Sequence, residues 1–138
     1  THPAEPKPSS IALITSLLTT MFEGACQHLD LVRLAYSIFY GPPQGAPPYD
    51  FTRFFDRTLA MVQELLTEGM ELGEFRPGDP LPGTWALVGS YHTILEEQFC
   101  RQTPRIDREG LIGVINLILD GLASPDQGRS SVDIGVLS

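Results

Sequence analysis

The chain has 138 residues, of which 42% are hydrophobic and 19% charged, which fits one globular domain with a core of its own. Its net charge of −8 opposes contact with phosphate backbones, and its nine lysines and arginines are scattered, so the chain by itself is a poor candidate for binding nucleic acid. No apolar run reaches the roughly 20 residues that cross a membrane. Two cysteines without a CxxC or a Cys/His cluster favour a reduced cytoplasmic protein with no metal or other cofactor.

Residues 1–9 are predicted to be a linker, because three prolines keep them extended and no apolar signal core is present. Ser9 or Ser10 can cap a first helix by accepting a backbone N–H. Apolar residues recur at three- and four-residue steps from Ile11 to Phe22, which gives that helix one apolar face.

A break is expected near residues 27–30, where Asp30 is the predicted cap of a second helix. This helix carries an apolar stripe and should stop at Gly41, which two prolines follow. Residues 41–50 hold four prolines and two glycines, so they are predicted to be a loop.

The clearest helical pattern in the chain runs from residue 51 to residue 72. Its apolar residues recur at the spacing that places them on one broad face of a helix, and that face should be buried. The residues are Phe51, Phe54, Phe55, Leu59, Val62, Leu65, Leu66 and Leu72.

Gly73 is the predicted stop of this third helix, because glycine tolerates the left-handed backbone of a helix end. Asp79 is the expected cap of a fourth helix with Pro80 at its first position, where a missing N–H is harmless. The fourth helix should run to about Arg101, and Asp107 should cap a fifth.

The fifth helix, LIGVINLILDGL at 111–122, is apolar in nearly every direction and must therefore be buried on most sides. A second subunit that covers its outer face is the favoured explanation, and a fully internal helix is the alternative. Since no strand-like alternation appears, the sequence predicts an all-α bundle of about five main helices over residues 10–123. Residues 124–138 are polar and are predicted to be a flexible tail.

Candidate chemistry is sparse. His92 and Glu96 are four residues apart and share a helix face, so they could bind a metal or act as an acid and a base. One such pair supplies only two ligands, and no nucleophile motif or glycine-rich phosphate loop is present. The chain is therefore not expected to be an enzyme, and no catalytic or metal-binding residue is assigned.

Aromatic residues give the better indication of function. Large rings with a few polar tips can line an apolar cavity between helices, although a plain aromatic core is the alternative for any single ring. The residues predicted to bind a small apolar or aromatic ligand are Phe22, Tyr36, Tyr40, Phe55, Met61, Trp85 and His92.

Three segments resemble the C-terminal half of tetracycline-repressor-type transcription regulators. LTEGMELGEFRPGDP (66–80) is similar to the family's segment between the long middle helix and the first dimer helix. ALVGS (86–90) resembles the small-residue stretch of that dimer helix, and LIGVINLILDGLA (111–123) resembles the final helix. The resemblance covers residues 10–123, and no residues of the family's N-terminal helix-turn-helix are present.

The resemblance implies a small-molecule-sensing domain that forms a homodimer and contacts operator DNA only through the missing N-terminal domain. A ligand would favour one orientation of the two subunits and so change the spacing of the two DNA-reading heads. The last two helices would form a four-helix interface with their twins. The residues expected there are Tyr91, Leu95, Phe99, Leu111, Val114, Ile115, Ile118, Leu119 and Leu122. Two other functions remain open, a helical interaction module without a ligand and a metal-dependent enzyme that uses the His92–Glu96 pair.

Overall fold

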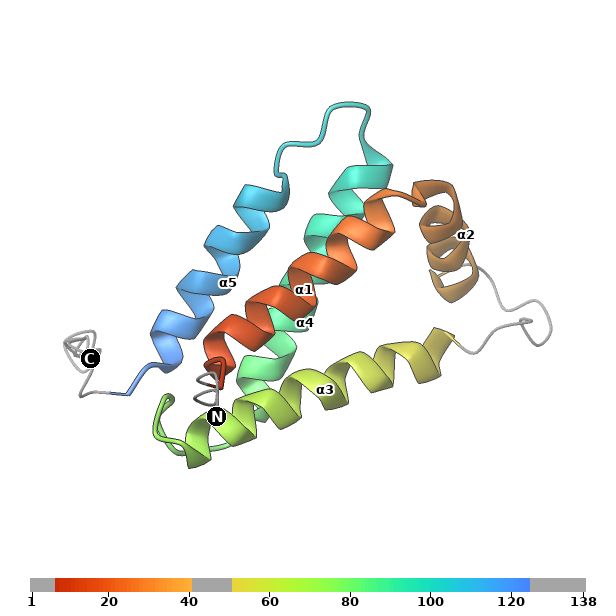
Figure 1. Cartoon of the computed structure of the whole chain (residues 1–138). Coiled ribbons are helices and arrows are strands. Elements are labelled where there is room, and N and C mark those ends of the chain that lie inside the picture. The colour runs from red at the N-terminus through yellow and green to blue at the C-terminus, as the bar shows by residue number, and fades with distance from the viewer. Residues whose placement is uncertain (1–6, 41–50, 125–138) are drawn as a thin grey trace, which may run out of the picture.

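The computed structural model describes residues 7–40 and 51–124, and within these ranges the chain forms five α-helices (Figure 1). The predicted all-α bundle is confirmed. The predicted loop at 41–50, most of the linker and all but the first residue of the tail lie outside the described residues. The helices are α1 (Ser10–Cys26), α2 (Leu29–Tyr40), α3 (Phe51–Glu71), α4 (Leu81–Cys100) and α5 (Arg108–Leu122).

The bundle is organised around α1 and α4, which lie side by side at its centre (Figure 1). α5 packs against both of them on one side, and α2 and α3 pack against both of them on the other. α4 therefore contacts all the other described helices, so each of its faces meets a different environment.

The helix ends follow the local signals of the sequence in most places. Ser9 caps α1 by accepting from Ala12 N, and Asp107 caps α5 by accepting from Gly110 N, as predicted. Two caps are shifted from their expected positions. Asp30 lies within the first turn of α2, and Pro80 occupies the cap position of α4, while the Asp79 carboxylate accepts from Leu81 N at 3.0 Å.

The core lies between α1, α3, α4 and α5 and is apolar apart from a few satisfied hydroxyls. Fully burying each such side chain contributes about 1.5–3 kcal/mol to stability. Its fully or almost fully buried members are Ile14, Leu18, Phe22, Val62, Leu66, Phe75, Leu87, Val88, Tyr91, Ile94, Leu95, Leu111, Ile115 and Leu119.

Two residues of the predicted apolar face of α3 are exposed, and the side chain of Phe51 lies outside the described residues. Phe54 and Leu72 keep 60% and 62% of their surface exposed, so their inward placement was wrong. They lie beside the buried stripe of the helix, and the helical period alone does not tell how wide a covered face is.

The turn after α3 is built on two glycines. Gly73 adopts a φ of 80°, a left-handed conformation that favours glycine, and α3 ends there as predicted. Glu74 N and Phe75 N then both donate to Gly69 O, at 2.9 and 3.2 Å. This fold-back lays the Phe75 ring against Gly69, where a side chain would overlap it, and leaves Phe75 only 1% exposed.

The same turn joins segments that are far apart in the sequence. The Glu74 carboxylate accepts from Ser10 N at 3.0 Å, and the Glu74 carbonyl accepts from Ser124 N at 3.3 Å. Arg76 N donates to Leu122 O at 2.9 Å. Hydrogen bonds of Glu74 and Arg76 therefore hold together three segments: the start of α1, the turn after α3 and the end of α5.

Candidate functional site

A cluster of aromatic rings surrounds His92 where α2, α3 and α4 meet. The His92 ring lies 5.1 Å from Phe55 of α3, 5.3 Å from its neighbour Tyr91 and 5.9 Å from Tyr36 of α2, measured between centroids. Tyr36 also packs on Phe99 at 4.9 Å, and Phe55 meets Trp85 edge-on at 6.1 Å. We call these six residues the ring cluster.

The ring-bearing residues of α4 lie along one side of that helix, which explains why the rings of the three helices meet. Trp85, His92 and Phe99 are seven residues apart, which places them on one side of the helix. That side faces α2 and α3, which are the helices that supply Tyr36 and Phe55. The ring cluster is only partly covered, because Trp85 keeps 53% of its surface exposed.

The polar centre of the ring cluster is a hydrogen bond between Tyr36 and His92. The Tyr36 hydroxyl lies within hydrogen-bond distance of His92 Nδ1. Burial lowers the pKa of His92 below its ordinary 6.5, so the imidazole is neutral at pH 7 and Nδ1 can accept the phenolic proton. A neutral histidine thus presents a single acceptor to a phenol that arrives from another helix.

Burial also acts on the neighbouring tyrosine. It raises the pKa of Tyr91 to about 12, with a smaller contribution from Cys26. Tyr91 therefore remains a neutral phenol throughout the physiological range, next to the neutral imidazole of His92.

α2 is attached to α4 by a second polar contact. Arg33 Nη2 donates to Phe99 O at 3.0 Å, a carbonyl in the last turn of α4 where a positive charge is favourable. Arg33 also pairs with Asp30 on its own helix at 3.2 Å. The contacts of Tyr36 and Arg33 set the position of α2 over the ring cluster.

Of the seven residues predicted to bind a ligand, four are brought together: Tyr36, Phe55, Trp85 and His92. Phe22 lies in the main core instead, and Met61 is on a more exposed side of α3. Tyr40 ends α2, and its side chain lies outside the described residues.

Sequence reasoning did not assign Tyr91 and Phe99 to the ring cluster, because it placed both in the dimer interface. The seven-residue spacing from His92 to Phe99 is a signal that could have identified Phe99. No sequence signal brings Tyr36 of α2 to His92 of α4, because that contact depends on how the helices pack.

The residues expected in the dimer interface divide into two groups. Tyr91, Leu95, Leu111, Ile115 and Leu119 are buried by the chain's own helices. The half-buried members, which keep some surface for a partner, are Phe99, Val114, Ile118 and Leu122.

Both α4 and α5 nevertheless carry exposed positions that are apolar or lack a side chain. Leu117 of α5, which the sequence reasoning did not assign, keeps 71% of its surface exposed. Other exposed positions on these two helices are small: Ala86 is exposed, and Gly89 and Gly113 are exposed with nothing within 4 Å of the position that a Cβ would take. We call these four residues the outer face.

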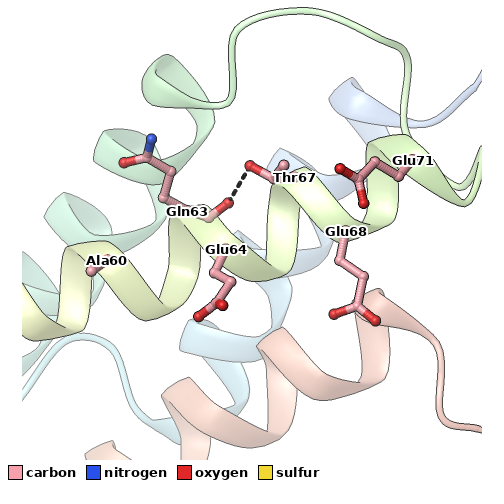
Figure 2. A pocket seen from close by; sticks show the side chains of 6 residues that line it. All are labelled: Ala60, Gln63, Glu64, Thr67, Glu68 and Glu71. Atoms are coloured by element: carbon pink, nitrogen blue, oxygen red, sulfur yellow. Dashed lines mark hydrogen bonds between the residues drawn. The ribbon is translucent and has the colours of Figure 1, made fainter.

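An open depression of about 670 Å³ lies elsewhere, on the polar side of α3 (Figure 2). Figure 2 shows that its lining comes from that single helix, with Thr67 Oγ1 donating to Gln63 O at 2.8 Å. Glu64, Glu68 and Glu71 make it acidic, and Lys7 pairs with Glu68 at 2.6 Å. Because one helix side cannot enclose a ligand, the ring cluster is the better candidate site.

Within residues 7–40 and 51–124, no group of three histidine, cysteine, aspartate or glutamate side chains is placed to hold a metal ion. His92 is engaged by Tyr36, a contact that the His92–Glu96 pairing did not anticipate. None of the described helices combines the length and the apolar character needed to cross a membrane.

Comparison of the chain with protein-family models, with curated proteins and with solved structures finds no match in any of the three.

Proposed function

We propose that residues 10–123 are the small-molecule-sensing and dimer-forming domain of a transcription regulator of tetracycline-repressor type. The effector would be an apolar or aromatic molecule bound at the ring cluster. A homodimer would form through the outer face. DNA contact would belong to a separate N-terminal domain, which agrees with the acidic charge of this chain.

The observation that carries this proposal is the division of α4 into three sides. One side supplies Leu87 and Ile94 to the core. A second side supplies Trp85 and His92 to the ring cluster. The third side is small and exposed around Gly89, which suits close approach of another helix.

This arrangement gives a ligand a direct way to influence the dimer. A molecule that enters the ring cluster changes the contacts of α4 with α2 and α3. α4 also carries part of the outer face, so a shift of α4 would change how the two subunits of the dimer are oriented. The ligand would then bind one orientation more tightly than the other, which is the requirement for coupling ligand binding to subunit orientation.

Two measurements on the purified chain test the proposal. Light scattering at several protein concentrations should give twice the mass of one chain. Thermal unfolding with a panel of aromatic compounds should give a raised melting temperature for at least one of them, because a ligand of the folded state stabilises it. A persistent monomer together with an unresponsive melting temperature would overturn the proposal.

A helical protein-interaction module is the second candidate. Leu31, Leu34 and Phe54 are large apolar side chains with more than half of their surface exposed, on α2 and α3. Leu31 and Leu34 are three residues apart and so share one side of α2, and exposed apolar side chains that lie together favour a protein partner. This candidate is preferred if the chain is monomeric and no aromatic compound shifts its melting temperature.

A further inference from the structure

The ring cluster already holds one small aromatic group of defined chemistry, the phenol of Tyr36. This side chain comes from α2, whereas the rings and the acceptor around it come from α4. Its ring packs on Phe99 and tilts against His92, and its hydroxyl meets Nδ1. The α4 surface is therefore complementary to a phenol, with two tilted ring contacts and one acceptor for its hydroxyl.

The electrostatics of this place restrict which aromatic molecules fit. Neutral His92 offers an acceptor to a hydroxyl donor and carries no charge that would attract an anion. Glu96 lies four residues further along the same side of α4 and is half-buried, so a ligand carboxylate would meet repulsion there. A simple phenol has a pKa of about 10, so it is an uncharged donor at neutral pH.

We propose that the effector is an uncharged phenol whose ring and hydroxyl take the place of Tyr36 against Phe99 and His92. This inference rests on the proposed sensing function and names the chemical class of its ligand. Binding exchanges an internal phenol for an external one and releases the side chain that attaches α2 to α4. α2 then remains tied to α4 through Arg33, whose bond to Phe99 O does not involve the phenol.

The experiment compares p-cresol with toluene, which has the same ring and methyl group but no hydroxyl. Dissociation constants of both are measured by NMR titration of the whole chain, following the indole N–H of Trp85, the single tryptophan. We compare the ratio of the toluene dissociation constant to the p-cresol dissociation constant between variants. The difference in hydrophobicity between the two probes is the same for every variant, so it cancels in this comparison.

Three variants give the ratio its meaning. His92→Phe keeps a ring and removes the acceptor, so the ratio should fall about fivefold, the effect of one neutral hydrogen bond. Tyr36→Phe removes the hydroxyl bond that both probes must displace, so both dissociation constants should fall about fivefold while their ratio stays as in wild type. Tyr91→Phe is the matched control, since it removes a phenolic hydroxyl whose ring also touches His92, and it should leave the ratio unchanged.

The outcomes separate this inference from the proposed function. If both probes bind and the ratio is the same in wild type and His92→Phe, the phenol assignment is overturned while aromatic sensing stands. If neither these probes nor larger aromatic compounds bind wild type, the sensing function itself is wrong. Should His92→Phe fail to fold by circular dichroism, the question is decided by the preference of wild type for p-cresol and by the tighter binding of both probes expected for Tyr36→Phe; equal constants for the two probes in wild type, or no tighter binding in Tyr36→Phe, would overturn the inference.

Discussion

Replacing Gly69 with alanine should destabilise the domain although alanine is the better helix former. Gly69 lies near the end of α3, beneath the Phe75 ring. An added methyl would overlap two carbons of that ring and lie 3.1 Å from Ser10 Cβ. Because Phe75 is 1% exposed, its ring has no solvent to move into, and the surrounding core must shift instead.

The magnitude follows from two opposed effects. Overpacking of a well-packed core costs about 1–3 kcal/mol, and the severe overlap at Gly69 places it in the upper half of that range. Helix propensity returns about 1 kcal/mol for alanine over glycine. The free energy of unfolding should therefore decrease by about 1–2 kcal/mol. With a urea dependence of about 2 kcal/mol per molar, the midpoint should fall by roughly 0.5–1 M.

Gly24→Ala is the matched control, because Gly24 is also a helical glycine but has nothing within 4 Å of the added methyl. It should raise the free energy of unfolding by about 0.5–1 kcal/mol through propensity alone. Both variants are unfolded in urea at one protein concentration and followed by circular dichroism, since any dimer makes stability depend on concentration. A Gly69→Ala protein as stable as wild type would refute the close packing of this turn.

Three further outcomes are expected. Leu117→Asp should leave the chain folded and reduce the mass in light scattering to that of a monomer. Ile115→Asp should instead unfold the chain, because Ile115 is 1% exposed and a buried charge costs several kcal/mol. A Leu117→Asp protein that is still a dimer would show that the outer face is not the interface. Glu74→Ala should lower the free energy of unfolding, measured in urea, by about 1 kcal/mol, because Ser10 N loses its acceptor at the start of α1. An unchanged free energy of unfolding would show that water fully replaces the carboxylate as acceptor. Stability should decrease as the pH falls below about 6.5 and level off below the folded pKa of His92, because burial lowers that pKa and the unfolded chain then binds more protons than the folded one. The urea midpoints at about pH 7.5 and about pH 5.5 should therefore differ less in His92→Phe than in wild type. An equal difference in both proteins would assign the pH dependence to other groups.

Much of the fold is predictable because its signals are local. A serine before an apolar stripe, an aspartate at the start of α5 and a glycine after α3 each act on the adjacent backbone, and Ser9, Asp107 and Gly73 behave as their types require. The one-residue shift at α4 arises because Asp79 accepts from Leu81 N just outside the helix while Pro80 occupies the cap.

The remainder depends on contacts between distant segments. In α5 both Ile115 and Leu117 are apolar, and only the placement of α1 and α4 makes one a core residue and the other exposed. Phe75 lies in a turn, outside any periodic pattern, yet it is fully buried because Gly69 leaves room for it. The pairing of Tyr36 with His92 likewise follows from the packing of α2 on α4, which no spacing within either helix encodes.

Glu74 holds both flanking segments of the helical domain, since its carboxylate accepts from Ser10 N and its carbonyl from Ser124 N. The path through the domain therefore starts and finishes at nearly the same point in space. A segment with such adjacent ends can replace a surface loop of a host protein without stretching it. Residues 7–124 should consequently work as an inserted module, for example within a split fluorescent reporter, where unfolding of the inserted domain would separate the two halves and reduce the fluorescence.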